Sequence, residues 1–364
     1  MIAGTCSQEG TAAYAAAREQ IAADHWRGVC ELSLSSFGLG SYLGVPSDAS
    51  DANYAAALQR ALELGVNVID TAINYRHQRS ERAIGRGLAK AIEAGTVTRD
   101  QVFVCTKGGY IPFDGQAPAD GGAWIEQTFV TPGIAAWDDI VDECHCMSPS
   151  FIKHQVDASR RNLGLETIDL YYVHNPEQQR RAMNEQQFYD RLTGAFRALE
   201  ECVAEGKIQS YGTATWDGYR VPRKAANSLS LEKVLKCAEA AGGAEHHFGF
   251  VQLPFNFQLV QALMAPTQAI GDREGSFLEA SYEYGVTVFT SVPLMQGQLR
   301  LGPEMHARFS GCGTDAQRLI QFARSAPGIT APLVGMSSVA HVEENAKVMS
   351  LPVLTDEEFN GFFG

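Results

Sequence analysis

Four side chains that can carry or stabilise a proton follow short hydrophobic stretches of the sequence. They are Asp70, Tyr75, Lys107 and His174, and they stand in the motifs VIDTAINY (68–75), VCTKGG (104–109) and DLYYVHNP (169–176). A carboxylate, a phenol, an ammonium and an imidazole together suit the reduction of a carbonyl. A hydride that arrives at carbon leaves a developing alkoxide, which needs a proton and polar stabilisation.

Tyr75 is the expected general acid and base. A free tyrosine has a pKa of about 10, so a role near neutral pH needs a downward shift of roughly 3 units, or about 4 kcal/mol. One ammonium at about 4 Å supplies that amount at an effective dielectric constant near 20. We therefore expect Lys107 to lower the pKa of Tyr75, Asp70 to hold Lys107 in place, and His174 to donate to the carbonyl oxygen.

The elements that position these residues alternate between strands and helices. The strands are nearly continuous apolar runs, as expected where helices cover both faces of a parallel sheet. We predict them at 32–39, 66–71, 102–106, 168–173, 208–213, 250–254, 286–291 and 332–335. All four residues lie at or just beyond the carboxyl ends of three successive strands, and in a closed barrel those ends converge.

The predicted helices have readable ends. One covers 52–64 and stops at Gly65, a second carries Ile84, Leu88 and Ile92 at helical spacing, and a third begins at Ser148-Pro149 and ends at Gly164. Eight strands alternating with helices predict an α/β fold, a single (β/α)₈ or TIM barrel.

Two segments lie outside this alternation. Residues 1–31 are an expected N-terminal extension with a helix at 12–23, and residues 32–364 form the expected barrel domain. Residues 111–147 are a long insertion after the third strand. Loops of this length are usually functional or disordered, and this one contains Trp124, Phe129 and Trp137. We expect it to fold over the mouth of the barrel and to influence substrate choice.

Composition limits the partners. The 364 residues carry a net charge of −13, which disfavours nucleic acid and anionic membrane surfaces. We expect no membrane span and no secretion signal, so the eight scattered cysteines are interpreted as reduced thiols in a cytoplasmic protein. The expected partner is a small carbonyl or alcohol substrate. The sequence does not indicate an oligomeric state.

The sequence from about residue 32 to 348 resembles the aldo-keto reductase family. The similarity rests on GLGSYLG (38–44), NVIDTAINY (67–75), SERAIGRGL (80–88), CTKGG (105–109), DLYYVHNP (169–176), EGKIQSYG (205–212), VQLPFN (251–256), PLMQGQL (293–299) and LVGMSSVAHVEEN (333–345). The resemblance implies a barrel of NADPH-dependent reductases. The family's catalytic aspartate, tyrosine, lysine and histidine fall on Asp70, Tyr75, Lys107 and His174.

The resemblance also implies a set of ligand contacts. The implied cofactor residues are Gly40, Ser41, Tyr42, Asp70, Thr215, Gln252, Ser291, Pro293, Leu294, Gly297, Gly335, Ser337, His341, Glu344 and Asn345, and the implied substrate contacts are Tyr42, Tyr110, Asn175 and Trp216. Four residues at three sites differ from the family pattern. Ala214-Thr215 replaces Ser-Asn, Ser291 replaces an aromatic residue, and His341 replaces an arginine. We therefore expect NADPH as the cofactor, with NADH as the alternative.

Two motifs are interpreted as structural. Gly38 and Gly40 suggest a phosphate-binding loop, but no helix follows directly, because Pro46 interrupts it. Glu143-Cys144-His145-Cys146 cannot easily direct three ligands at one tetrahedral zinc, so no metal is expected. Two alternative functions remain open: a redox-neutral change of a sugar or natural product with transient cofactor use, and a nicotinamide-binding regulatory subunit.

Overall fold

A closed barrel of eight parallel strands forms the centre of the molecule. The structure is a computed structural model and describes residues 1–363. The barrel strands, in order around the barrel, are β3 (Gly38–Gly40), β4 (Val68–Asp70), β5 (Phe103–Gly108), β6 (Ile168–His174), β7 (Ile208–Ala214), β8 (Phe248–Pro254), β11 (Thr287–Ser291) and β12 (Ala331–Gly335). The barrel closes by parallel pairing of β12 with β3. The predicted (β/α)₈ fold is therefore confirmed.

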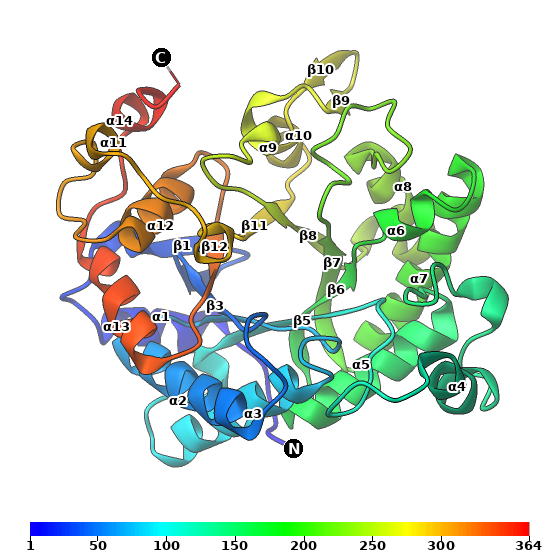
Figure 1. Cartoon of the computed structure of the whole chain (residues 1–364). Coiled ribbons are helices and arrows are strands. Elements are labelled where there is room, and N and C mark those ends of the chain that lie inside the picture. Colours follow the sequence, from blue (N-terminus) through cyan, green and yellow to red (C-terminus); the bar gives the residue numbers. More distant parts are fainter. Residues whose placement is uncertain (364) are drawn as a thin grey trace.

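One principal helix follows each strand and packs outside the barrel (Figure 1). These helices are α2 (Asp48–Leu64), α3 (Arg79–Glu93), α5 (Pro149–Leu163), α7 (Glu185–Ala204), α8 (Leu231–Gly242), α10 (Phe277–Glu283), α12 (Asp315–Ser325) and α13 (Val339–Ala346). α5 ends at Gly164 as predicted, and Gly164 has the left-handed conformation. Shorter elements lie in the loops: α6 (Glu177–Arg180), α9 (Gln261–Met264), the hairpin β9–β10 (Gln268–Ile270, Arg273–Gly275), α11 (Pro303–His306) and α14 (Asp356–Asn360).

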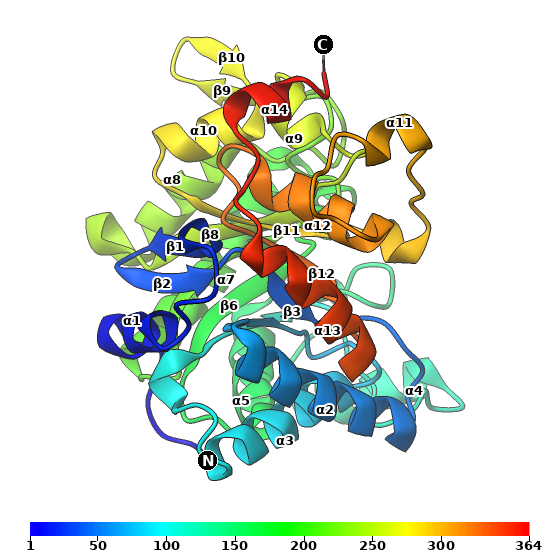
Figure 2. The same ribbon diagram turned by 90° about the vertical axis from the view of Figure 1, so that its left-hand side faces the viewer.

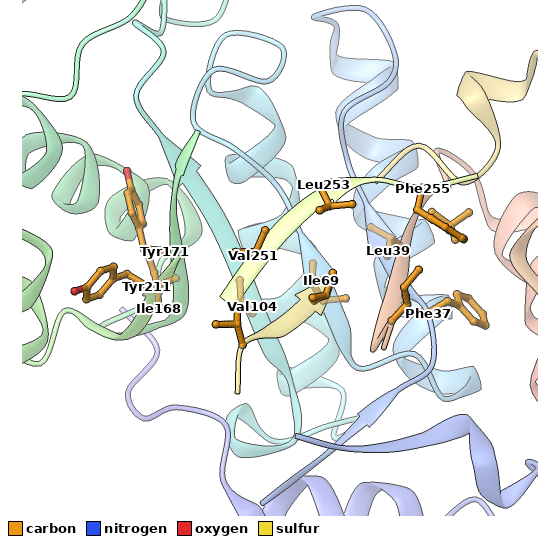
Figure 3. Packing of buried hydrophobic residues seen from close by; sticks show 14 of the residues in the cluster. Phe37, Leu39, Ile69, Val104, Ile168, Tyr171, Tyr211, Val251, Leu253 and Phe255 are labelled. Carbon is orange, nitrogen blue, oxygen red and sulfur yellow. The ribbon is translucent and has the colours of Figure 1, made fainter. Parts of the chain in front are cut away.

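Successive side chains of each strand point alternately to the helices and to the barrel interior. Leu39, Ile69, Val104 and Val251 belong to the large cluster between strands and helices (Figure 3). Their neighbours in sequence point inward. The interior near the amino ends of the strands is apolar, with the rings of Phe103, Phe250 and Phe289 about 6 Å apart. Buried polar residues, including Asp70, Lys107 and His174, lie at the carboxyl ends of the strands instead.

The amino end of the barrel is covered by a hairpin that the sequence did not predict. The expected single strand at 32–39 is wrong: β2 (Leu32–Ser35) pairs with β1 (Trp26–Val29) in an antiparallel hairpin, and only β3 enters the barrel. The chain bends between β2 and β3, and at this bend the Ser35 backbone N–H donates to Asn67 Oδ1, 2.8 Å away. Leu34 packs into the interior cluster below Phe103 and Phe289.

The N-terminal helix begins earlier than expected. α1 covers Gln8–Ala16 instead of 12–23, because the Ser7 side chain accepts a hydrogen bond from Gly10 N and caps the helix there. Beyond its end, the Arg18 guanidinium donates to the backbone oxygen of Tyr14. Figure 2 shows α1, β1 and β2 at one end of the barrel, and α4 (Gly121–Ile125) and α11 at the opposite end.

The insertion at 111–147 forms its own small core at the rim. It contains α4, a π-helical turn (Glu126–Val130) and a 3₁₀ turn (Trp137–Asp139). Phe129 packs against Phe151 of α5, with ring centroids 5.3 Å apart. Trp124, Ile134 and Ile140 surround that pair. The segment is therefore attached to α5, and Figure 1 shows α4 toward the outside of the barrel.

Among residues 1–363, no helix combines the length and the apolarity that a membrane crossing needs.

Candidate active site

The alternation of the strands brings the predicted residues together at the carboxyl end of the barrel. Ile69, Thr106 and Val173 point outward, so Asp70, Lys107 and His174 point inward. On β8, Gln252 points inward for the same reason. The four inward residues come from β4, β5, β6 and β8.

Lys107 and Asp70 form a buried ion pair. Lys107 Nζ lies 2.7 and 2.6 Å from the two carboxylate oxygens of Asp70, and it also donates to the backbone oxygen of Thr71 at 2.8 Å. Gln252 Nε2 donates to Asp70 Oδ1 at 2.9 Å. Burial opposes a charge on Lys107, but the attraction of Asp70 outweighs it and raises the pKa of the lysine. Lys107 is therefore a fixed ammonium.

Tyr75 lies directly over this ammonium, in the loop after β4. Lys107 Nζ is 5.0 Å from the centroid of the Tyr75 ring. The Tyr75 ring meets Tyr42 and His174 edge to face, at 4.9 and 5.9 Å between centroids. The pKa of Tyr75 is raised above its ordinary value of 10, because burial outweighs the opposing effect of Lys107. Lys107 acts in the expected direction, but the net shift is upward instead of downward, so the phenol keeps its proton at neutral pH.

His174 is a neutral imidazole. Burial, reinforced by the nearby Lys107, holds the pKa of His174 well below its ordinary value of 6.5. Its Nδ1 is buried and has no hydrogen-bond partner among the described residues. A neutral imidazole carries one N–H, so His174 can donate one hydrogen bond to a ligand without bringing a second positive charge into the site.

A cavity of about 700 Å³ opens above these residues. All the cofactor and substrate residues inferred from the sequence line it: Gly40, Ser41, Tyr42, Asp70, Tyr110, Asn175, Thr215, Trp216, Gln252, Ser291, Pro293, Leu294, Gly297, Gly335, Ser337, His341, Glu344 and Asn345. Tyr75 and His174 also line it, whereas Lys107 lies beneath and contributes none of the lining. The volume suits an organic ligand, and the binding roles of these residues stay predictions.

Several lining residues were not foreseen. They are Leu43, Asn74, Val292, Gln296, Arg300, Ala316 and Leu333. Leu333 follows from the alternation of β12, but the others lie in loops or at a helix start whose path the sequence does not reveal. Arg300 adds an exposed cation to the cavity wall. Its Nη1 donates to the backbone oxygens of Gly297 and Leu299, at 2.6 and 2.8 Å.

The residues present fit a dinucleotide. Gln252 and Thr215 offer amide and hydroxyl groups next to Asp70, which suits a carboxamide. At the other end, the amino terminus of α13 is capped by Ser338, and this helix carries His341 and Asn345. The buried Asn345 Oδ1 has no partner among the described residues and is free to accept from a polar ligand.

One mouth residue is fixed by an unforeseen carboxylate. Trp216 is 43% exposed and lines the cavity. Glu177 Oε1 accepts hydrogen bonds from the backbone N–H groups of Trp216, Asp217 and Gly218, at 2.6, 3.0 and 3.4 Å. The buried Glu177 therefore holds the loop after β7 in place.

The insertion reaches the cavity only indirectly. Among the described residues, the lining includes Tyr110 at its junction but none from 111–147. Trp124 Nε1 donates to the Pro112 backbone oxygen, and Trp137 Nε1 donates to Glu126. Both tryptophans therefore form hydrogen bonds within the insertion. A cover over the mouth stays a prediction.

The glycines at 38 and 40 belong to a strand. A Cβ at Gly38 would lie 2.8 Å from Leu333 Cδ2 and 2.9 Å from Val68. Glycine is therefore required there because β3 passes close to its neighbours, and the structure contradicts a phosphate loop at Gly38.

Known proteins are similar to this chain in sequence and in fold. The sequence profile of the aldo/keto reductase family matches residues 36–240. An NADH-specific methylglyoxal reductase from Escherichia coli is 27% identical over 195 residues, which covers 52% of this chain and 51% of the relative. The NADPH-dependent aldose reductase of Saccharomyces cerevisiae is 26% identical, covering 45% of each chain. The chain thus spans about half the length of the curated relatives it matches.

A solved structure extends the similarity of fold to nearly the whole chain. An aldo/keto reductase from Klebsiella pneumoniae, in complex with NADP and acetate, superposes with a TM-score of 0.60. It is 21% identical, and the match covers 91% of both chains.

Proposed function

Because the chain belongs to the aldo/keto reductase family, we propose that it transfers a hydride between NADPH and the carbonyl of a small molecule. One observation carries this proposal. The buried Lys107–Asp70 pair lies beneath the Tyr75 phenol and the neutral His174, at the base of a cavity lined by groups that suit a dinucleotide.

Tyr75, Lys107 and His174 each have one role in the proposed reaction. The nicotinamide cofactor, when bound, supplies the hydride. Tyr75 gives its proton to the developing alkoxide oxygen, and Lys107 stabilises the phenolate that remains. Neutral His174 donates a hydrogen bond to the same oxygen, which orients the carbonyl. In the reverse direction, the phenolate accepts the proton of an alcohol.

The protonated state of Tyr75 matters for direction. A phenol whose pKa is raised holds its proton at neutral pH and is ready to act as an acid. Asp70 keeps Lys107 charged, so the phenolate formed during the reaction faces an ammonium at once. The site is therefore prepared for reduction, and oxidation of an alcohol is favoured as the pH rises.

The substrate end of the cavity carries aromatic rings and neutral hydrogen-bonding groups. Tyr42 and Trp216 are exposed at the mouth, at 55% and 43%, and we assign them to substrate contact. Asn175 Nδ2 donates to the Tyr110 hydroxyl at 3.2 Å, which fixes both side chains on the wall beside His174. This arrangement favours an uncharged carbonyl compound.

The activity is tested by mixing the purified chain with NADPH or NADH and a panel of aldehydes, ketones and sugars. We expect loss of the reduced-nicotinamide absorbance that depends on the carbonyl, together with a stoichiometric alcohol product. If the cofactor binds but no carbonyl in the panel causes its oxidation, the proposal is contradicted. Product formed without net cofactor oxidation would instead identify redox-neutral chemistry.

Arg300 supports NADPH as the preferred cofactor. The loops after the neighbouring strands β11 and β12 meet in the cavity wall, and they bring Arg300 to the same lining as Ser337 and His341. A guanidinium there can bind the additional phosphate group of NADPH. Arg300 would then replace the arginine that the family has at the position of His341.

The change Arg300→Met tests this assignment. Because only NADPH carries the additional phosphate, we expect the dissociation constant for NADPH to rise at least fivefold and that for NADH to change less than twofold. Both constants are measured by quenching of protein fluorescence. Arg223→Met is the control, since Arg223 is a surface residue paired with Glu274 outside this cavity. Equal losses for the two cofactors would remove Arg300 from the phosphate site.

A further inference from the structure

The end of the insertion returns to the edge of the active site as a short strand-like segment. Ile111 N donates to Cys144 O, and Cys146 N donates to Gly109 O, both at 2.8 Å. Tyr110 and His145 are paired in an isolated antiparallel bridge. His145 therefore lies beside Gly109 and Tyr110, which directly follow β5, the strand that carries Lys107.

The His145 side chain points inward and ends at the backbone of the catalytic histidine. His145 is fully buried, and its Nε2 lies 2.7 Å from the backbone oxygen of His174. Because a carbonyl oxygen only accepts, Nε2 must carry the proton and donate it, which fixes the tautomer. Burial lowers the pKa of His145 to about 4, so the ring is neutral.

Tyr110 packs against both imidazoles. Its ring lies 5.1 Å from the His145 ring and 5.1 Å from the His174 ring, edge to face in each case, with interplanar angles of 86° and 89°. The three rings form a continuous packed group from the insertion to the cavity. A shift of His145 would therefore disturb the wall that Tyr110 and His174 share.

Gly109 shows how closely His145 approaches. Its φ of +129° is in a region that favours glycine. A Cβ at this position would lie 2.9 Å from His145 Nε2 and 3.1 Å from the His174 backbone oxygen. The absence of a side chain at Gly109 is what admits the hydrogen bond between the two histidines.

Two glutamines hold this arrangement from behind. Gln179 Nε2 donates to the His145 backbone oxygen at 3.0 Å. Gln155 Oε1 accepts from Gly109 N, and its Nε2 donates to Tyr110 O, both at 2.7 Å. Both glutamines are fully buried, so the segment around His145 is fixed before any ligand binds.

From this geometry we propose that His145 is a positioning residue, which sets the position and orientation of the His174 and Tyr110 side chains for carbonyl binding. It acts through the hydrogen bond to the His174 backbone and through its contact with the Tyr110 ring. It does not line the cavity itself. The inference rests on the proposed carbonyl reduction, and it gives the insertion a role at the site without requiring the insertion to cover the mouth.

Two variants of similar volume separate hydrogen bonding from packing. His145→Gln keeps an N–H donor near the His174 oxygen, whereas His145→Met removes it. We expect His145→Met to lower kcat/KM for carbonyl reduction at least tenfold and His145→Gln to restore at least a third of the wild-type value. The dissociation constant for NADPH should stay within twofold in both, because the assigned cofactor residues lie elsewhere.

His25 provides a matched control at the opposite end of the barrel. It is also fully buried, and its Nε2 lies 3.1 Å from a backbone oxygen, that of Gly65. His25→Met should lower thermal stability by an amount similar to His145→Met while leaving kcat/KM within twofold. Similar losses of kcat/KM in the two variants would mean that His145 is merely structural, and would overturn the proposal.

A second readout does not depend on activity. The imidazole resonances of His174, assigned by ¹⁵N-histidine labelling, should shift in His145→Met and stay unchanged in His25→Met. If the wild-type chain reduces no carbonyl, the proposed function fails, and the His174 resonances alone decide the positioning role. If His145→Met does not fold, Gln179→Met is measured with the same expectation, since it removes the hydrogen bond to the His145 backbone. Unchanged His174 resonances, or a kcat/KM within twofold of wild type, overturn the inference.

Discussion

The chemistry of single residues is set by burial as much as by neighbouring charge. Lys107 and Asp70 are buried and paired within 2.7 Å, and an uncompensated charge there would be costly. The same burial raises the pKa of Tyr75 despite the ammonium beside it. In the proposed reaction, the pair therefore provides a positive charge for the phenolate as it forms, and it does not ionise the phenol beforehand.

Tyr75→Phe tests that role. The change removes the proton donor but keeps the ring that packs against Tyr42 and His174. General acids typically contribute 10²- to 10⁴-fold, so we expect kcat to fall at least about a hundredfold. The dissociation constant for NADPH, measured by fluorescence, should change less than twofold. Tyr282→Phe is the control, since Tyr282 is 82% exposed on α10. Retention of more than a tenth of the wild-type kcat would exclude Tyr75 as the acid.

Glu81 gives a prediction for stability against pH. The side chain is fully buried, and its oxygens accept from Thr106 Oγ1 at 2.6 Å and Asn162 Nδ2 at 2.8 Å. Burial outweighs these hydrogen bonds and raises the pKa of Glu81 above its ordinary 4.5. The folded chain thus keeps a proton that the unfolded chain has lost, so this residue makes stability fall as pH rises above about 4.5.

Glu81→Gln should remove that dependence. We expect the free energy of unfolding of the variant to decline less than that of the wild type from pH 5 upward, by at most about 1.4 kcal/mol per pH unit. Urea denaturation at several pH values measures the difference between the two chains. Parallel curves across the range would show that Glu81 is ionised in both states.

At the scale of elements, the regular alternation was predictable and the exceptions were not. The apolar runs that became β4 to β8 identify strands covered on both sides, and Gly164 marks the end of a helix by its conformational freedom. At the bend that divides 32–39, the Ser35 backbone N–H is bonded to the side chain of Asn67, which is distant in sequence. Local sequence cannot reveal such a tertiary contact.

The same distinction holds for the site. Alternation along the strands places Asp70, Lys107 and His174 inward, so their convergence could be inferred. The rise in the pKa of Tyr75 could not, because burial of a loop residue is a property of the folded molecule. The position of His145 depends on the path of a long insertion, and no local pattern predicts that path.

An unusual turn follows Tyr75. Arg76, His77 and Gln78 all have positive φ, at 46°, 57° and 69°, and a left-handed residue costs roughly 1–2 kcal/mol when it is not glycine. Arg76 compensates with a buried ion pair to Asp51 at 2.9 Å. His77 O accepts from Gly115 N in the insertion at 2.9 Å. The insertion thus supports the turn after Tyr75 as well as the backbone of His174.

The β1–β2 hairpin contains a turn that can be improved. Val29 pairs with Leu32, so Cys30 and Glu31 form a two-residue loop with φ values of 46° and 69°. Two positive φ values fit a type I′ turn, which favours Asn-Gly. Both side chains are exposed, so the double change Cys30→Asn and Glu31→Gly should stabilise the chain by about 1 kcal/mol. Urea denaturation measures this, and no gain in stability would mean that the turn is unstrained.

At the scale of the whole molecule, segments far apart in sequence pack against the barrel and its loops. The N-terminal hairpin packs under the interior cluster through Leu34. At the other side, the C-terminal segment packs on the loop that follows β11, which carries Arg300 and Gln296 to the cavity. Phe362 stacks on Phe309 of that loop, with ring centroids 5.0 Å apart.

This contact predicts that the C-terminal segment supports cofactor binding. Phe362 also meets Phe257 at 5.4 Å and Phe322 of α12 at 5.5 Å, so it joins the loop to the barrel's outer layer. Aromatic pairs contribute about 0.5–1.5 kcal/mol each beyond the burial of their surface, so Phe362→Ala should destabilise the fold by roughly 2 kcal/mol. With the loop less well held, the dissociation constant for NADPH should rise at least threefold. Phe363→Ala is the matched control, because Phe363 is 38% exposed and has no ring contact with the loop. Urea denaturation and fluorescence titration measure the two effects. If Phe362→Ala lowers stability but binds NADPH as tightly as Phe363→Ala does, the loop is held by its own contacts and the C-terminal segment only stabilises the fold.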